Sequence, residues 1–155
     1  MTIYAYQALL NEDSTPYLAK TASYDIDGRN RYNAPYDLAE FIKDSLQIQH
    51  CAEEYLYVLC LNCHNSLIGL FEASHGSIDT SIASTREIMQ KALLLGAVKI
   101  ALTHNHPSAD PEPSSLDIRA TQDIKRACEI LGLQLIDHII VTTDSWYSMS
   151  SADML

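Results

Sequence analysis

Strand-like segments predict most of a β-sheet in this chain. Runs rich in aromatic and β-branched residues, bounded by turn-forming residues, favour strands. The predicted strands are residues 1–10, 54–61, 67–73, 98–103, 133–143 and 146–150. The turn formers "HNS" at 64–66 join two of these strands as a hairpin. Residues 11–33 are polar and rich in turn formers, so we expect them to be irregular.

Three segments space their apolar residues three or four positions apart, which predicts amphipathic helices. They cover residues 34–47, 81–97 and 114–132. Ser84 and Glu87 predict a capping box at the start of the second helix, and Gly96 predicts its end. No repeat or linker divides the sequence. The elements therefore predict a single α/β (α+β) domain, a mixed β-sheet flanked by helices.

Composition and charge narrow the class of protein. Of the 155 residues, 47% are hydrophobic and 19% are charged, which is typical of a folded globular domain. No apolar run reaches the roughly 18 residues of a membrane span, and the N-terminus shows no signal peptide. We therefore expect a cytoplasmic protein with no membrane partner. A net charge of −10 and the lack of a basic run argue against nucleic acid as a partner, and no feature predicts an oligomeric state.

The four cysteines offer a second, weaker motif. In a chain without an export signal we expect reduced thiols. "CLNCH" at 60–64 matches the C-x-x-C-H pattern of c-type haem attachment, and Cys60 with Cys63 is also half of a zinc-ligand pattern. Haem attachment belongs to exported proteins, and no second pair follows at a suitable spacing. We expect a buried Cys60 on a strand and Cys63 beside a turn.

The stretch "THNHPSADPEPSSLD" at 103–117 carries the strongest candidate chemistry. His104 and His106 follow a predicted strand, and alternation along an extended backbone directs both imidazoles to the same side. A proline-rich loop then leads into a predicted helix whose first turn contains Asp117. Two imidazoles and a carboxylate suit Zn²⁺, and three protein ligands leave a fourth tetrahedral position open, as in catalytic zinc sites.

Each of these residues also has a structural interpretation. Ser114 and Asp117 have the spacing of a helix cap, in which Asp117 also interacts favourably with the helix dipole. His104 and His106, taken alone, could equally be an exposed or locally hydrogen-bonded pair in a loop. Iron or manganese could occupy the same ligands in place of zinc.

The complete pattern is more specific than its parts. From His104 to Asp117 the sequence has the form H-x-H-P-x6-S-x2-D, which resembles the JAMM motif of the JAB/MPN metalloprotease superfamily. The segments "REIMQKALLLGAVKIALTHNHPS" and "ILGLQLIDHIIV" are similar to its RadC branch. The resemblance implies a RadC/JAB (MPN) domain of cytidine-deaminase-like architecture at residues 53–155. Residues 1–52 would add a strand, an irregular segment and a helix packed on its core.

The resemblance also implies a metal-dependent hydrolase. Its Zn²⁺ ligands would be His104, His106 and Asp117. Ser114 would help to hold the developing oxyanion, as the matching serine does in the family. The implied reaction is hydrolysis of an amide in a protein or peptide substrate, by a metallopeptidase or isopeptidase.

The family also uses a glutamate from an upstream strand. Glu72 in "LIGLFEASHGSID" is the candidate that would accept a proton from water and deliver it to the leaving amine. Glu87 competes for this role, although its place in the predicted cap already explains it. The plain alternative is that Glu72 is an ordinary charge on an edge strand.

Three further residues raise expectations. Ala109 stands where RadC relatives commonly have glycine, and because alanine is strained at positive φ we expect this loop to lie slightly differently. His138 in "LIDHIIV" is either a buried histidine held by a neighbour or a residue that orients a metal ligand. His75 lies near Glu72 in the sequence and could line the substrate cleft.

Two other functions compete with hydrolysis. The first is an accessory role in DNA repair or processing, which the RadC name suggests. The acidic charge and the lack of the helix-hairpin-helix region of longer RadC proteins disfavour it. The second is a noncatalytic JAB-fold binding module. Such members usually lose one or more ligands, whereas this sequence retains the full pattern.

Overall fold

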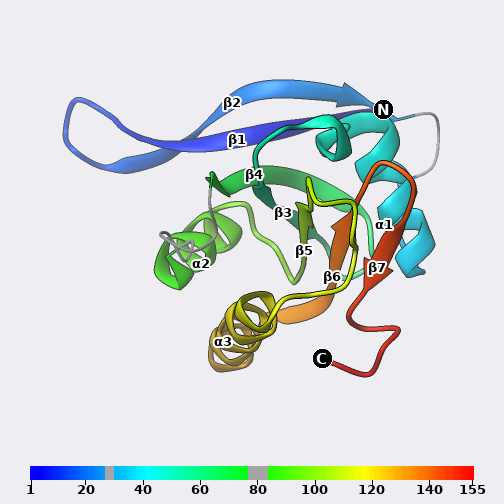
Figure 1. Cartoon of the computed structure of the whole chain (residues 1–155). Coiled ribbons are helices and arrows are strands. Elements are labelled where there is room, and N and C mark those ends of the chain that lie inside the picture. Colours follow the sequence, from blue (N-terminus) through cyan, green and yellow to red (C-terminus); the bar gives the residue numbers. More distant parts are fainter. Residues whose placement is uncertain (27–29, 77–83) are drawn as a thin grey trace.

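The computed structural model of the chain describes residues 1–26, 30–76 and 84–155 (Figure 1). Its strands are β1 (Thr2–Leu10), β2 (Pro16–Asp25), β3 (Tyr55–Leu61), β4 (Leu67–His75), β5 (Lys99–Asn105), β6 (Gln134–Val141) and β7 (Trp146–Ser148). Its helices are α1 (Pro35–Phe41), α2 (Thr85–Leu94) and α3 (Ser115–Leu131). A π-helical turn, η1 (Ile42–Leu46), and a 3₁₀ turn, η2 (Ile48–His50), follow α1.

The strands of the described chain form one mixed sheet with the order β2-β1-β4-β3-β5-β6-β7. Neighbouring strands are antiparallel except for β1 with β4 and β5 with β6, which are parallel. β5 and β6 are parallel because the helix α3 crosses over between them. The predicted fold class, a mixed sheet flanked by helices, is confirmed.

The helices cover both faces of the sheet (Figure 1). On one face Ile42 from η1 joins a buried apolar cluster with Leu59 of β3. On the other face Ile88 of α2 and Ile124 of α3 join a second cluster with Val58 of β3. Val58 and Leu59 are consecutive and belong to different clusters because side chains alternate along a strand. Each strand residue can therefore be assigned to the α1 face or to the α2–α3 face.

The strand β2 corrects the expectation that residues 11–33 are irregular. It pairs antiparallel with β1, from Pro16 opposite Leu10 to Asp25 opposite Thr2. Most of its side chains are exposed, so the sequence has no apolar alternation that would reveal it. Pairing with β1, rather than burial of one face, makes this segment a strand.

The helix boundaries agree with the predictions at most ends. The predicted helix 34–47 is present as α1 followed by η1. Gly96 follows α2 with a φ of 71°, as expected for a helix end. Ser84 precedes α2, but its side chain makes no capping bond, so the predicted capping box with Glu87 was wrong. The carbonyl of Ser84 accepts from the amide of Glu87 instead. Residues 81–83 lie outside the described residues.

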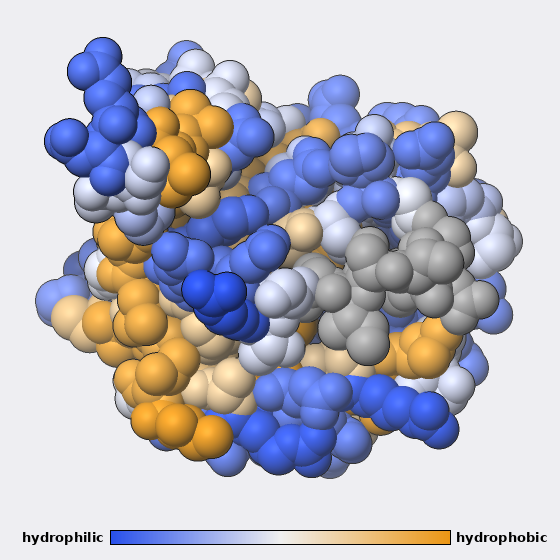
Figure 2. Space-filling model, turned by 90° about the vertical axis from the view of Figure 1, so that its left-hand side faces the viewer, coloured by the Kyte–Doolittle hydropathy of each residue, from blue (hydrophilic) through white to orange (hydrophobic). Residues whose placement is uncertain are grey.

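Large apolar side chains remain exposed near the C-terminal ends of α2 and α3. Figure 2 shows orange atoms gathered along the left edge of the face that these helices form. The exposed residues there are Leu93, Leu94, Val98, Ile130 and Leu131. Those of α3 lie at the opposite end of that helix from Asp117. None of the described helices is long and apolar enough to cross a membrane.

The cysteines do not form a joint site. Cys60 is buried in β3, whereas Cys63 is exposed in a turn with its Sγ 3.2 Å from Nδ1 of His64. All four cysteines are free thiols. The two residues of the C-x-x-C pattern thus lie in different environments, as the sequence predicted.

Candidate metal centre

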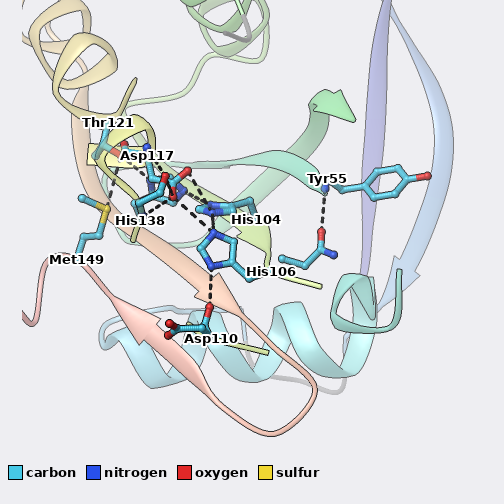
Figure 3. A network of polar contacts seen from close by, with 10 residues as sticks. Tyr55, His104, His106, Asp110, Asp117, Thr121, His138 and Met149 are labelled. Carbon is cyan, nitrogen blue, oxygen red and sulfur yellow. Dashed lines mark hydrogen bonds and ion pairs between the residues drawn. The ribbon is translucent and has the colours of Figure 1, made fainter. Parts of the chain in front are cut away.

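Three predicted ligands converge on the α2–α3 side of the sheet (Figure 3). His104 lies in β5, His106 just beyond its end, and Asp117 in the first turn of α3. Nε2 of His104 is 3.4 Å from Oδ1 of Asp117, and Nε2 of His106 is 3.5 Å from Oδ2. One ligand atom from each residue lies within 4.8 Å of the others. Among the described residues, this is the group that could hold a metal ion.

The loop after β5 determines the orientation of His106. Ala109 has a φ of 64°, and its amide donates to the carbonyl of His106 at 3.2 Å. The turn places the carbonyl of Asp110 2.7 Å from Nδ1 of His106. A carbonyl can only accept, so Nδ1 carries a proton, and Nε2 is the nitrogen that faces His104 and Asp117. Ala109 adopts the left-handed conformation that glycine would adopt without strain.

Asp117 is both a cap and a member of the cluster. The amide and the hydroxyl of Ser114 donate to Oδ2 of Asp117 at 2.7 and 2.6 Å, and the amide of Asp117 returns a bond to the Ser114 hydroxyl at 3.2 Å. This capping box orients the carboxylate toward the histidines. The two interpretations of the sequence, helix cap and metal ligand, therefore describe one arrangement.

His138 of β6 lies directly against His104. Nδ1 of His104 is 2.7 Å from Nε2 of His138, and Nδ1 of His138 is 2.6 Å from Oγ1 of Thr121 in α3. His138 is 2% exposed and Thr121 is fully buried. The sequence left the role of His138 open, and the structure places it against a candidate ligand. Thr121 was missed because a threonine inside a helix has no motif that distinguishes it.

Burial and hydrogen bonding set the protonation of the cluster. Burial first, and then the neighbouring His138, hold the pKa of His104 well below its ordinary value. Burial alone would raise the pKa of Asp117, but the hydrogen bond with His106, the electrostatic interaction with His104 and the bonds from Ser114 outweigh it and lower that pKa. At neutral pH the cluster thus contains a neutral His104 and an ionised Asp117, which are the forms that bind metals.

The structure does not bring Glu72 to this cluster. Glu72 lies opposite Tyr57, whereas the preceding residue, Leu56, lies opposite His104. Because alternate residues point to opposite faces, Glu72 lies on the α1 face of the sheet. Its carboxylate contacts Nδ1 of His75 at 2.7 Å and the hydroxyl of Tyr57 at 3.4 Å. It lines a separate cavity of about 350 Å³ together with Tyr6, Tyr24 and Lys91, among others.

A different glutamate, Glu54, lies on the side of the candidate ligands. It immediately precedes β3, two residues before Leu56, which pairs with His104. Alternation therefore directs Glu54 toward the α2–α3 face. Its charge is one of the contributions that raise the pKa of His106, after the hydrogen bonds that the His106 ring donates to Asp117 and to the Asp110 carbonyl. Aligning the predicted strand 54–61 against 98–103 would have found this residue, because an antiparallel pairing places Glu54 opposite His106.

Asn105, between the two histidines, fixes the segment that carries Glu54. Its amide nitrogen donates to the carbonyls of Cys51 and Glu53 at 3.3 and 3.0 Å, and its Oδ1 accepts from the amide of Tyr55 at 2.8 Å. Figure 3 shows the bond to Tyr55. Asn105 is 1% exposed, so water does not compete for these bonds. The backbone on both sides of Glu54 is thus attached to the strand of the candidate ligands.

Comparison with known proteins agrees with this arrangement. Residues 32–154 match the family described as the RadC-like JAB domain. A UPF0758 protein of Clostridium botulinum (strain Eklund 17B) is 40% identical over 130 residues, which are 84% of this chain and 54% of the relative. A UPF0758 protein of Carboxydothermus hydrogenoformans is 36% identical over 130 residues, 83% of this chain and 57% of the relative.

The chain spans about half the length of these curated relatives. Their names state no activity, so they identify a family rather than a reaction. The matched residues include α1 and both elements that carry the histidines and Asp117. With this match over most of its length and with the H-x-H-P-x6-S-x2-D residues assembled in space, the chain belongs to the RadC-like JAB domain family.

Proposed function

We propose that the chain is a metal-dependent amide hydrolase of peptidase or isopeptidase type, with His104, His106 and Asp117 as the ligands of a Zn²⁺ ion. The observation that carries the proposal is the convergence of these ligand atoms within 4.8 Å in a RadC-like JAB domain. When bound, zinc would supply Lewis acidity, which lowers the pKa of a water molecule and polarises a carbonyl.

The donor set supports zinc over magnesium or calcium. Two imidazole nitrogens with one carboxylate are typical of zinc, whereas the harder cations select oxygen ligands. His106 donates from Nδ1 to the Asp110 carbonyl, so Nε2 is the nitrogen that would bind a metal, in place of the proton that it shares with Asp117. Asp117 is held in its ionised form. Three ligands from the protein would leave room for water and substrate, as a catalytic site requires.

We assign the transfer of the proton to Glu54 in place of Glu72. The position of Glu54 on the ligand side of the sheet and its electrostatic effect on His106 support this assignment. Glu54 would accept a proton from the attacking water and deliver it to the leaving amine. The carboxylate of Glu72 is occupied by His75 and Tyr57 on the opposite face.

Ser114 has a role that depends on Asp117. Its hydroxyl donates to Oδ2 of Asp117 at 2.6 Å, so within the proposal it first orients this ligand. To hold a developing oxyanion, as the resemblance implies, the hydroxyl would turn from Asp117 toward the substrate carbonyl.

A protein or peptide is the substrate class that we propose. The net charge of −10 disfavours attraction to a phosphate backbone, and this argues against a nucleic acid substrate. A noncatalytic binding module would not need neutral His104 and ionised Asp117 buried side by side, at 1% and 3% exposure. Such burial is costly unless another interaction compensates for it.

The test compares metal content and hydrolysis across four variants. We expect about one zinc per wild-type chain. The zinc should be lost in His104→Ala and in Asp117→Ala, because each substitution removes one ligand. Glu54→Gln should keep the zinc but lower peptide or isopeptide hydrolysis by roughly 10²–10⁴-fold, because it removes the proton acceptor. Glu72→Gln is the matched control and should keep both.

The contrary results are equally specific. A wild-type protein that binds no metal after incubation with zinc would exclude the hydrolase proposal. Loss of hydrolysis in Glu72→Gln together with an active Glu54→Gln would return the proton transfer to Glu72. Zinc binding without hydrolysis of any peptide or isopeptide substrate would favour the binding module.

A further inference from the structure

We propose that Thr121 and His138 determine which nitrogen of His104 carries the proton, and thereby keep its Nε2 free for a metal. This inference concerns positioning, and it rests on the proposed metal site only for its functional consequence. The residues form a chain of contacts that starts at the Asp117 carbonyl and ends at the His104 ring, and Figure 3 shows these side chains together.

The direction of these hydrogen bonds is determined at Thr121. Oγ1 of Thr121 is 2.6 Å from the carbonyl of Asp117, one turn earlier in α3, and 3.6 Å from Sδ of Met149. A carbonyl oxygen and a thioether sulfur can only accept, so the single hydroxyl proton is donated to one of them. The short distance favours the carbonyl. Toward His138, therefore, the hydroxyl oxygen has only lone pairs to offer.

The arrangement of protons then propagates through the two rings. Nδ1 of His138, 2.6 Å from Oγ1 of Thr121, must carry a proton. In a neutral imidazole the other nitrogen is an acceptor, so Nε2 of His138 accepts from Nδ1 of His104 at 2.7 Å. His104 therefore carries its proton on Nδ1. Its Nε2 accepts from Nε2 of His106 at 2.8 Å and lies 3.4 Å from Oδ1 of Asp117, and a cation would take the place of the proton between the two rings.

Burial makes this arrangement effective. The exposed fractions of His104, Thr121 and His138 are 1%, 0% and 2%, so water does not offer alternative partners. Each bond in the chain is between 2.6 and 2.7 Å. Reversing one ring would place two donors or two acceptors against each other inside the core, and an unmatched buried polar group costs about 1–3 kcal/mol.

The test uses a pair of substitutions at Thr121. Thr121→Val keeps the shape and removes the hydroxyl, whereas Thr121→Ser keeps the hydroxyl. Thr103→Val is the matched control, because Thr103 is also fully buried next to His104 but its hydroxyl has no partner in the described part of the chain. The readouts are the imidazole nitrogen shifts of ¹⁵N-histidine-labelled, metal-free protein, and the affinity for Zn²⁺ in competition with a chromophoric chelator.

We expect wild type, Thr121→Ser and Thr103→Val to show His104 protonated on Nδ1 alone. In Thr121→Val the His104 signals should report a mixture of both tautomers, and Zn²⁺ affinity should fall about 10–100-fold, as for other partners of metal-bound histidines. Wild-type His104 protonated on Nε2 would overturn the proposal without any variant. So would an unchanged tautomer in a folded Thr121→Val protein. If the tautomers respond as expected but wild type binds no zinc, only the proposed hydrolase function fails.

Discussion

At the scale of single residues, the candidate centre depends on groups that bind the far side of each ligand. His106 is oriented by a backbone carbonyl, His104 by another histidine, and Asp117 by the hydroxyl and amide of Ser114. The two contacts to the histidines use the ring nitrogen that would not face a metal. The arrangement of the ligands is therefore determined by the protein itself, which lowers the cost of ordering them on binding.

Ala109 has a strained backbone conformation in the turn that orients His106. Its φ of 64° lies in the left-handed region, which costs an alanine roughly 1 kcal/mol relative to glycine. We predict that Ala109→Gly raises the free energy of unfolding by about 0.5–1 kcal/mol, measured by urea denaturation. Ala120→Gly in the middle of α3 is the control, and should lower it by about 1 kcal/mol.

A decrease of similar size in both variants would contradict this prediction, because it would mean that Ala109 is not strained. The zinc affinity of Ala109→Gly should remain that of wild type. The Asp110 carbonyl keeps its position against His106 if the turn is unchanged.

At the scale of elements, the alternation of side chains along β3 and β5 decides which residues can cooperate. Leu56 and Tyr57 are neighbours in β3, yet one lies opposite His104 and the other opposite Glu72 and Thr103. A shift of one residue therefore moves a side chain to the other face of the sheet. Glu54 and Glu72 are both acidic residues near the end of a strand. The alternation of side chains decides which of them lies on the face of the candidate ligands.

The connection between β5 and the start of β3 is open to a direct test. Asn105→Ala removes the bonds to Cys51, Glu53 and Tyr55, and at about 1 kcal/mol each this should lower the free energy of unfolding by about 2–3 kcal/mol. Hydrogen exchange at the Tyr55 amide should become faster. Hydrolysis should fall while zinc is retained, because the segment carrying Glu54 is released.

Asn62→Ala is the control for this prediction. Asn62 accepts from the amides of His64 and Ser66 in the turn between β3 and β4, so its loss should affect stability but not hydrolysis. If the Tyr55 amide exchanges hydrogen at the wild-type rate in the Asn105→Ala protein, the bonds of Asn105 do not hold the segment that carries Glu54.

The sequence predicted most elements and three converging residues, because these depend on local patterns. The H-x-H spacing and the cap at Ser114 are local, and each has one arrangement in a strand or at a helix start. Glu54 and Thr121 could not be predicted in the same way. Glu54 meets His106 only through the pairing of β3 with β5, and Thr121 meets His138 only through the packing of α3 on β6.

At the scale of the whole molecule, the buried cluster makes the stability of the metal-free protein depend on pH. Burial lowers the pKa of His138 to about 4, from an ordinary value of about 6.5. The folded state thus favours the neutral form, and the stability this gives is complete above pH 6.5 and lost as the pH falls toward 4. We predict a fall of about 3 kcal/mol in the free energy of unfolding across this window.

The other two histidines of the cluster do not reverse this sign. The pKa of His104 is also lowered, chiefly by burial, and adds to the fall. The pKa of His106 is raised, chiefly by its bond with Asp117, so its contribution is complete below about 6.5 and is lost as the pH rises through its folded value. Urea denaturation at pH 7, 5.5 and 4 measures the effect. A flat profile would contradict it, and His138→Gln should flatten the profile in part.

The hairpin of β1 and β2 changes the kind of edge that the sheet presents to other molecules. β1 pairs with β4 at Ala5 and Leu70, and the whole hairpin lies before residue 32, where the family match begins. Without it, the apolar strand β4 would offer its open backbone groups to another chain. With it, that edge belongs to β2, which is largely exposed and carries Pro16 and Lys20, residues that discourage strand addition. The hairpin thus replaces an apolar edge, which could add strands from other molecules, with a solvent-exposed one. We expect its removal to cause aggregation before it causes any change in the chemistry of the metal centre.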